Sequence, residues 1–233
     1  MHVPEKWRIQ EPAQIADIIN RYSFATVVSP SLDATHVPLI YDQAQNCLIG
    51  HIARNNHHKK AAENSDVLAI FHGPHDYIDP TWYQGKPNVP TWNYVAVHVH
   101  GSLHWLDEAQ TIDAVQQLVQ KYQPSLIHEQ ELHEQELDEQ ELDGQELDEQ
   151  ALTEKTKSAD TQPTMPLDYQ HKLAKGIIGF RIDIDRVEAK AKLGQHRSQP
   201  DQLGTVKGLM NSNSPDAQQL LAIMEQLSLG LGS

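Results

Sequence analysis

The stretch VPTWNYVAVHVHG, residues 89–101, joins a turn to a strand. Trp92 and Asn93, which follow a proline, indicate a turn at its start. After the turn, valines at every second position face one side, while His98 and His100 face the other side. A strand buried on both faces has no need of imidazoles. The pattern therefore predicts a strand with a core on one face and a polar pocket or an interface on the other.

The rest of the chain predicts a mainly β protein. Apolar runs predict strands at residues 24–29, 35–41, 47–53, 66–73, 94–105 and 176–184. Spacings of three and four predict helices at 11–23, at 107–122 with Ile112, Val115, Val119 and Tyr122 on one face, and from Ser214 onward. Strands and helices do not alternate as they do in parallel sheets. The expected fold is an antiparallel barrel or sheet decorated by α-helices.

Two segments that break these patterns are informative. Pro38 lies within the predicted strand at 35–41 and indicates a sheet edge or a bulge. Residues 74–90 are rich in proline and aromatic side chains and are expected to form a packed loop that shapes a pocket.

The acidic charge of the chain is concentrated in one segment. Of the net charge of −14, residues 128–160 contribute −11, from thirteen acidic residues and two lysines, which leaves −3 for the rest. A five-residue EQELD-type repeat fills this segment. On a helix, that period carries its leucines around the axis without forming an apolar stripe. We expect a single domain over residues 1–233, with an exposed or disordered insertion at 128–160 and a C-terminal helical extension at 199–230.

Composition limits the classes of protein. The single cysteine, Cys47, excludes an intrachain disulfide and suits a reducing compartment. The first ten residues lack the apolar core of a signal peptide, and no apolar run approaches the ~18 residues of a membrane helix. The expectation is a cytoplasmic protein with no membrane partner.

A basic segment after the third predicted strand is a candidate phosphate site. The sequence GHIARNNHHKK, residues 50–60, passes from a strand through an asparagine cap, Asn55 or Asn56, into a predicted short helix. A helix N-terminus offers free N–H groups to an anion. Donors surround it on Arg54, His57, His58, Lys59 and Lys60. The alternative is a solvated basic turn.

Other chemistry has weaker support. Fourteen histidines raise the question of a metal, but none falls in a known ligand motif and one cysteine cannot build a thiolate cluster. We therefore predict no metal site, and histidines that hydrogen-bond in a pocket or interface. There is no G-x-S-x-G, P-loop or G-x-G-x-x-G sequence, and no catalytic residue is assigned.

Several motifs together resemble a known family. ATHVPL, GHIARNN, FHGPHDYIDPTWY, NVPTWNYVAVHVHG and GIIGFRIDIDRVEAKAKLGQHR occur in this order. They are similar to those of the PaiB-type FMN-binding negative transcriptional regulator family, over nearly the whole chain outside the acidic segment. The resemblance implies a split β-barrel of the pyridoxamine-phosphate-oxidase-like kind, a homodimer, and FMN at the subunit interface. The EQELD repeat departs from the family, and RNNHHKK is more basic than the usual stretch.

The resemblance and the residues together give a predicted FMN site. The edge strand would present backbone groups to the flavin ring, the basic segment would hold the phosphate, and the tryptophan loop of a neighbouring subunit would cover the ring. The predicted cofactor-binding residues are Thr35, His36, Val37, Pro38, His51, Ala53, Arg54, Asn55, His57, His58, Lys59, Trp92, Asn93, His98, Gln195 and Arg197.

Three functions remain open. The first is a flavin-binding negative transcriptional regulator, for which DNA is a partner by resemblance only. The second is an FMN-dependent oxidoreductase that acts on a small molecule or on another flavin, because FMN itself carries the chemistry. The third is a histidine-rich metal-binding barrel. No helix-turn-helix is evident, and the near-neutral charge outside the insertion gives little attraction to phosphates.

Overall fold

The computed structural model describes residues 1–56, 58, 64–123 and 174–232. The chain divides into two compact units. Unit 1 comprises Met1–Gly50, Asn56–Trp105 and Phe180–Ser233, and unit 2 comprises His51–Asn55 and Leu106–Gly179. The acidic insertion predicted at 128–160 lies outside the described residues, as does the short helix predicted after Asn56 except for His58.

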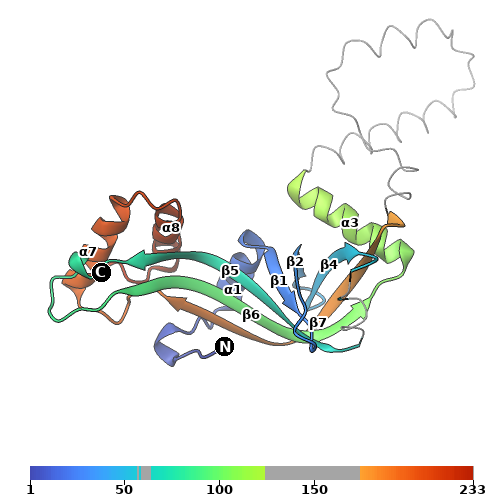
Figure 1. The fold of residues 1–233 in the computed structure, drawn as a ribbon, viewed down its shortest axis with the longest axis horizontal. Coiled ribbons are helices and arrows are strands. Elements are labelled where there is room, and N and C mark those ends of the chain that lie inside the picture. The colour runs from blue at the N-terminus through green and yellow to red at the C-terminus, as the bar shows by residue number, and fades with distance from the viewer. Residues whose placement is uncertain (57, 59–63, 124–173, 233) are drawn as a thin grey trace, which may run out of the picture. The chain divides into compact units, whose positions relative to one another are not determined.

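Seven strands form one mostly antiparallel sheet in the order β2-β1-β5-β6-β7-β4-β3 (Figure 1). The strands are β1 Phe24–Val28, β2 Ala34–Pro38, β3 Ile40–Asp42, β4 Cys47–Ala53, β5 Asp66–Ile78, β6 Thr91–Trp105 and β7 Ile177–Lys192. The helices are α1 Pro12–Arg21, α3 Glu108–Tyr122, α7 Gln199–Met210 and α8 Ala217–Leu227, with 3-10 turns η1 Glu5–Trp7 and η2 Pro80–Trp82. The predicted fold class, an antiparallel β-structure with peripheral helices, is confirmed.

The predicted strand at 35–41 is divided between the two edges of the sheet. β2 ends at Pro38 and β3 begins at Ile40, and these two strands are the first and last in the strand order. Between them Leu39 is fully buried, and its backbone N–H donates to the carbonyl of Ser23 at 2.9 Å. The edge position predicted from Pro38 is correct, and among the described residues no strand lies beside the outer side of β2.

The sequence predicted that β5 stops at Gly73-Pro74, but the strand continues to Ile78. His72 pairs with Ala96 and His75 with Tyr94, so Gly73 and Pro74 together lie opposite a single residue of β6. This is the two-against-one geometry of a β-bulge, which accommodates a proline because the bulged residues leave the ladder. The predicted loop at 74–90 is correspondingly shorter and begins after β5.

β6 and β7 are also longer than predicted. β6 begins at Thr91, so Trp92 and Asn93 belong to the strand and pair with Tyr77 and Asp76 rather than forming a turn. β7 runs to Lys192 instead of ending at Ile184. The alternation that the sequence predicted for residues 94–100 is confirmed, since Val95, Val97 and Val99 are all buried.

The core of unit 1 lies between the sheet and its helices. In Figure 1, β5, β6 and β7 run side by side and α8 lies along part of β5. Fully buried side chains come from both layers, among them Ile18 of α1, Phe71 of β5, and Leu220 and Met224 of α8. The helix predicted from Ser214 onward is therefore present as α8, and its apolar side is buried.

α7 lies within the helical extension predicted at 199–230, although the only individual helix predicted there began at Ser214; two glycines lower the intrinsic helix propensity of α7. The structure shows why they are there. A Cβ on Gly204 would overlap the carbonyl oxygen of Trp82, and a Cβ on Gly208 would overlap the Trp82 indole. The glycines therefore permit close packing of α7 against η2.

Unit 2 contains α3, which begins where the sequence predicted. The Asp107 carboxylate accepts the backbone N–H of Gln110 at 2.8 Å, and the Gln110 side chain accepts the backbone N–H of Asp107 at 3.1 Å, a complete capping box. The predicted apolar face is wrong. The buried residues of the helix are Thr111, Ala114 and Leu118, and Tyr122 is 53% exposed.

Candidate functional site

The strongest candidate site in unit 1 is a partly buried polar network beside the edge strand β2. The Oγ1 of Thr35 lies 3.2 Å from the Nδ1 of His58 and 3.5 Å from the Nδ2 of Asn56. The backbone N–H of His58 donates to the Oδ1 of Asn56 at 2.9 Å. His58 is only 2% exposed. Thr35 and His58 were both predicted as site residues, and the structure brings them together.

This network fixes the orientation of the Asn56 amide beside the imidazole. Because the Oδ1 of Asn56 accepts a backbone N–H, its Nδ2 is the donor to Thr35. We assign the Thr35 hydroxyl as the donor to the Nδ1 of His58, an assignment that places the proton of the neutral ring on Nε2. Burial lowers the pKa of His58, an effect that Asp33 partly opposes, so the ring is neutral at pH 7.

The Nε2–H of His58 is the chemically notable atom of the site. It is buried and has no hydrogen-bond partner among the described residues. A buried donor without a partner costs free energy, and an acceptor at this position would remove the cost. The site therefore suits an acceptor-rich group such as a phosphate, a hydroxyl or a carbonyl oxygen.

The remaining predicted residues of β2 flank this network. His36 is exposed, stacks on Phe24 at a centroid distance of 6.3 Å and places its Nδ1 2.9 Å from the Oγ1 of Thr26. Val37 faces the core and is 6% exposed, so only its backbone is available to a ligand. Pro38 pairs with Phe24 at the end of the β1–β2 ladder.

Four predicted residues, His51, Ala53, Arg54 and Asn55, lie in unit 2. His51 has a buried Nδ1 without a partner in the described part of the chain, and burial lowers its pKa. Arg54 is exposed and is tied to the chain before β7. Its backbone N–H donates to the carbonyl of Gly176 at 2.9 Å, and its Nε donates to the carbonyl of Lys175 at 3.0 Å. Ala53 and Asn55 are exposed. His57 and Lys59 lie outside the described residues.

Trp92 and Asn93 lie on opposite faces of β6. Trp92 is 52% exposed and has the rings of His75 and Tyr77 at 6.2 and 6.0 Å. Asn93 is 2% exposed, and its Nδ2 has no partner among the described residues. Trp92 is thus a surface residue able to cover a neighbouring group, whereas Asn93 is a second buried donor.

His98 and His100 share a face of β6 in different environments. The Nδ1 of His98 is buried without a described partner, and burial followed by the nearby N-terminal ammonium lowers its pKa. His100 contacts Glu188 of β7 through Nε2 at 3.0 Å, and the N-terminal ammonium of Met1 reaches the same carboxylate at 2.7 Å. The imidazole face predicted from the sequence is therefore partly an ion-pair network.

Gln195 and Arg197 lie in the connection from β7 to α7. The side chain of Gln195 bonds only to backbone groups, those of Leu193, Lys6 and Ala191. The guanidinium of Arg197 lies 4.3 Å from the ring centroid of Tyr83, and its NH1 donates to Asn88 at 3.2 Å. The amide of Gln195 is thus used in hydrogen bonds to the backbone, whereas the guanidinium of Arg197 still has N–H groups that could bind a ligand.

Sequence reasoning missed part of the network. Asn56 was assigned only a helix cap, although it also orients Thr35 and His58. Glu188 and the lysines of β7 lie in one of the motifs quoted for the resemblance, but they were not predicted as site residues, and their strand was expected to end before them. Over the described residues there is no group of three or more His, Cys, Asp or Glu side chains that could hold a metal ion. Within the same residues no helix is long and apolar enough to cross a membrane.

Comparisons with known proteins point to a flavin. The model of a family described as "Putative FMN-binding domain" matches residues 1–186. The chain is 29% identical over 231 residues to the protease synthase and sporulation protein PAI 2 of Bacillus subtilis, with 97% of each chain covered. It is 28% identical over 223 residues to an uncharacterised protein of Emericella nidulans, covering 83% of this chain and 80% of that one.

Solved structures share the fold. The flavocytochrome Anf3 of Azotobacter vinelandii aligns with a TM-score of 0.53 and 14% identity over 83% of this chain and 73% of the other. An FAD and heme binding protein of Mycobacterium smegmatis aligns with a TM-score of 0.51 and 12% identity over 80% and 74% of the two chains. At these identities the likeness concerns the fold alone.

Proposed function

Because the chain belongs to the FMN-binding domain family whose model matches residues 1–186, we propose that the network of Thr35, Asn56 and His58 beside β2 contacts its FMN. The observation that carries the proposal is the buried Nε2–H of His58, which lacks an acceptor. The residues present fit the cofactor, since the phosphate of FMN offers only acceptor atoms and the unpaired edge of β2 offers backbone groups to a flavin ring.

Each residue has a distinct task in this proposal. Asn56 orients the Thr35 hydroxyl, and Thr35 fixes the tautomer of His58 so that Nε2–H donates to the phosphate. Burial of His58 excludes water from that bond and strengthens it. Bound FMN supplies redox chemistry through its ring system. Trp92, exposed on unit 1, would cover the ring of a flavin held by a second copy of the chain.

A titration tests this assignment. We expect His58→Ala to weaken FMN binding by roughly tenfold to a hundredfold, the value of one hydrogen bond to a charged group. Riboflavin, which lacks the phosphate, should bind the variant and the wild type alike. Flavin fluorescence measures both affinities. His2→Ala, which removes an exposed histidine, is the control. Unchanged FMN affinity in His58→Ala would place the phosphate elsewhere, with Arg54 the next residue to substitute.

We propose a negative regulatory role in transcription for the FMN-bound protein. The support is the family resemblance and the similarity to PAI 2, whose name refers to protease synthase and sporulation. The C-terminal helices do not suit DNA. The apolar side of α8 is buried, and residues 199–227 carry Lys207 against Asp201, Asp216 and Glu225.

Two assays separate regulation from catalysis. A regulator that contacts DNA should shift DNA fragments taken upstream of genes whose expression changes when the chain is deleted, and saturating FMN should alter that shift. An FMN-dependent oxidoreductase should instead consume a reduced nicotinamide or reduced flavin without any such DNA. Turnover in the absence of a shift would overturn the regulatory proposal.

A further inference from the structure

A group of cations in unit 1 surrounds the indole of Trp7, and we call it the Trp7 cluster: Lys6, Trp7, Lys190, Lys192 and His196. The ammonium groups of Lys6, Lys190 and Lys192 lie 4.7, 5.2 and 5.8 Å from the Trp7 ring centroid. The His196 ring meets the indole edge-on at 5.6 Å. Four side chains that are cationic or can become so thus surround one aromatic ring.

The cluster consists almost entirely of donors. The Nε1–H of Trp7 is buried and has no partner among the described residues. Lys190, only 6% exposed, uses one N–H on the carbonyl of His2. Lys192 donates to the Thr91 hydroxyl and to the carbonyl of Trp92. Each of the two ammonium groups therefore keeps at least one N–H unused.

No carboxylate balances these charges in the described part of the chain, where Lys6, Lys190 and Lys192 form no ion pair. Glu5, the neighbour of Lys6, is occupied, because its two oxygens accept from Arg8 at 3.2 Å and from Gln10 at 2.6 Å. Burial, together with the charges of Lys190 and Arg197, lowers the pKa of Lys192. Partly buried cations that lack a counter-ion repel one another, and an anion would relieve this repulsion.

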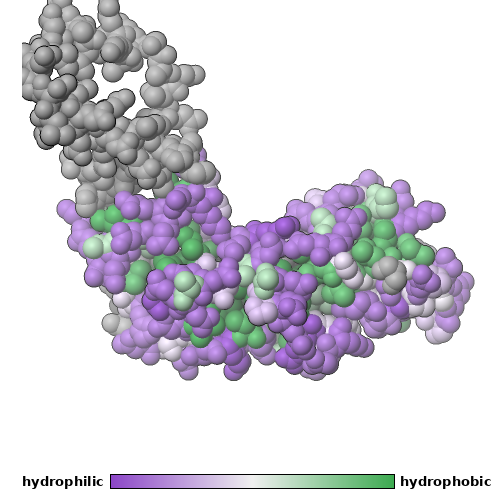
Figure 2. Space-filling model, turned by 180° about the vertical axis from the view of Figure 1, so that it is seen from behind, coloured by the Kyte–Doolittle hydropathy of each residue, from purple (hydrophilic) through white to green (hydrophobic). Residues whose placement is uncertain are grey.

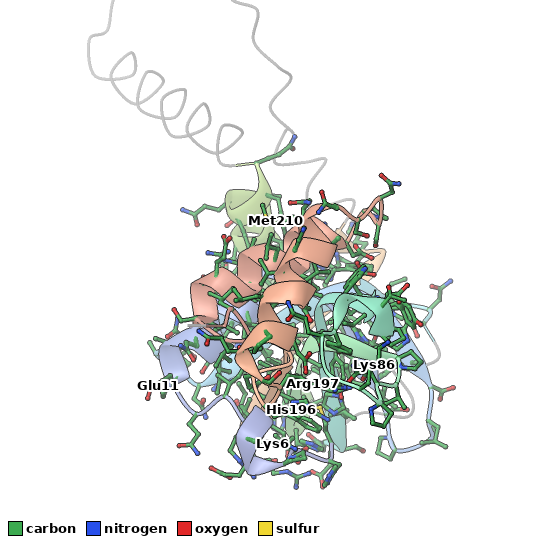
Figure 3. All side chains as sticks on the ribbon, turned by 90° about the vertical axis from the view of Figure 1, so that its left-hand side faces the viewer. Lys6, Glu11, Lys86, His196, Arg197 and Met210 are labelled. Carbon is green, nitrogen blue, oxygen red and sulfur yellow. The ribbon has the colours of Figure 1, made fainter. Side chains whose placement is uncertain are left out.

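Arg197 extends the cluster toward the β7–α7 turn. Figure 3 shows Lys6, His196 and Arg197 near one another at the end of unit 1 that faces the viewer. The pKa of His196 is lowered by burial and then by the charges of Lys6, Arg197 and Lys192, which agrees with that arrangement. The guanidinium is held at Tyr83 and keeps further N–H groups for a ligand. The carboxylate of Asp201 is also nearby, because the pKa of Asp201 is lowered first by the backbone N–H of Gly85 and then also by the charge of Arg197.

We propose that the Trp7 cluster, with Arg197, binds a phosphate dianion carried by a ligand other than the bound flavin. A dianion matches several converging cations better than a single carboxylate, and its oxygens accept from ammonium, guanidinium and indole N–H groups alike. That the ligand is not FMN rests on the proposed function, which assigns the flavin phosphate to His58.

The test is a calorimetric titration of inorganic phosphate into the FMN-saturated protein at constant ionic strength. We expect one phosphate to bind per chain. Lys6→Gln and Lys192→Gln should each weaken that binding tenfold or more. Lys207→Gln, which removes an exposed lysine of α7, should leave the affinity unchanged. Lys6 makes no hydrogen bond through its ammonium in the described residues, so its variant decides the matter even if Lys192→Gln disturbs the contacts to Thr91 and Trp92.

Two results would overturn the proposal. One is a wild-type protein that binds no phosphate, or binds it as well after Lys6→Gln as before. The other is a Lys6→Gln variant that loses affinity for FMN but not for riboflavin, because the cluster would then hold the phosphate of the flavin. Failure of the His58 assignment is read separately, from His58→Ala and FMN alone, and does not change the phosphate titration.

Discussion

Glu188 shows how one side chain on β7 organises its surroundings. Its Oε2 accepts from the N-terminal ammonium at 2.7 Å and contacts the Nε2 of His100 at 3.0 Å. The hydrogen bond from the ammonium, with a smaller contribution from His100, lowers the pKa of Glu188 to about 2. A carboxylate that is held ionised in this way ties the N-terminal segment, which carries Trp7, to the sheet.

Glu188 should therefore make stability depend on pH. A carboxylate whose pKa is lower in the folded protein stabilises it above the unfolded pKa of about 4.5, and this contribution is lost as the pH falls toward about 2. We expect Glu188→Gln to lower the free energy of unfolding by roughly 1–2 kcal/mol at pH 7, a range that allows for solvent screening. Chemical denaturation at pH 7 and pH 3 measures the effect, which should shrink at pH 3. Glu225→Gln, at an exposed position of α8, is the control, and an equal loss at both pH values would contradict the prediction.

At the scale of single residues, the sequence indicated the chemistry of the site but not its contacts. The clustering of His57, His58 and the lysines predicted a donor-rich segment, and His58 does end in a buried donor. Its partner Thr35 lies 23 residues earlier in the sequence, and the two side chains come into contact only because the chain folds back between β2 and the end of β4. No spacing encodes such a contact. By contrast, the exposed side chain of His36 and the buried side chain of Val37 are predictable, because successive side chains of a strand point to opposite faces.

At the scale of secondary-structure elements, α7 contains two glycines, Gly204 and Gly208, although glycine is unfavourable in a helix. Gly208 allows the Trp82 indole to lie against the helix backbone. Alanine is favoured over glycine in a helix by about 1 kcal/mol, but an added Cβ would overlap the indole. The packing of η2 on α7 therefore opposes helix propensity at this position, and the two effects can be compared by mutation.

We expect Gly208→Ala to destabilise the protein by about 1–3 kcal/mol, because the overpacking cost exceeds the gain in propensity. Thermal unfolding measures the change, and the fluorescence of Trp82 should respond as its ring is displaced. Lys207→Ala, at the exposed neighbouring position, should be close to neutral. A Gly208→Ala variant as stable as the wild type would mean that the indole moves aside without cost.

Two errors in the predicted boundaries, the ends of β5 and of β7, share a cause, which is a β-bulge. Gly73-Pro74 is typical of a chain break, yet β5 passes through it because two residues face one on β6. On the other side of β6, His100 pairs with Arg186 but Gly101 with Ile184, and a Cβ on Gly101 would overlap the carbonyl oxygen of Asp183. Periodicity predicts where a strand is regular. It does not predict that a neighbouring strand will absorb an extra residue.

The prediction of which face of α3 is buried was wrong for a different reason. Ile112, Val115, Val119 and Tyr122 form a regular stripe, whereas the buried residues of the helix are Thr111, Ala114 and Leu118. A small threonine is buried because its hydroxyl accepts the backbone N–H of Gly179 at 3.0 Å, which brings the start of β7 against the helix. Hydrophobicity alone does not anticipate a contact that depends on a hydroxyl and a glycine.

For the molecule as a whole, charge and exposed apolar surface indicate what it contacts. Outside residues 128–160 the net charge is −3, which gives no general attraction to nucleic acid. Apolar surface is exposed in several places on the face shown in Figure 2. On unit 1 the large exposed side chains include Val89 at 67%, Trp92 at 52% and Tyr77 at 42%. The start of β6 and the end of β5 therefore expose aromatic and apolar side chains on unit 1.

We expect the protein to form a homodimer through this surface, because burying aromatic side chains removes apolar area from water and most oligomers of one chain are symmetric. Light scattering after size exclusion should give about twice the chain mass of 26.3 kDa at micromolar concentration. The double substitution Tyr77→Glu and Trp92→Glu should shift the mass toward the monomer, since the partners would have to bury two carboxylates. Met210→Glu, which changes a side chain 61% exposed on α7, should leave the dimer intact. A wild-type protein with the mass of one chain, or a double variant that still dimerises, would show that these residues serve the ligand site alone.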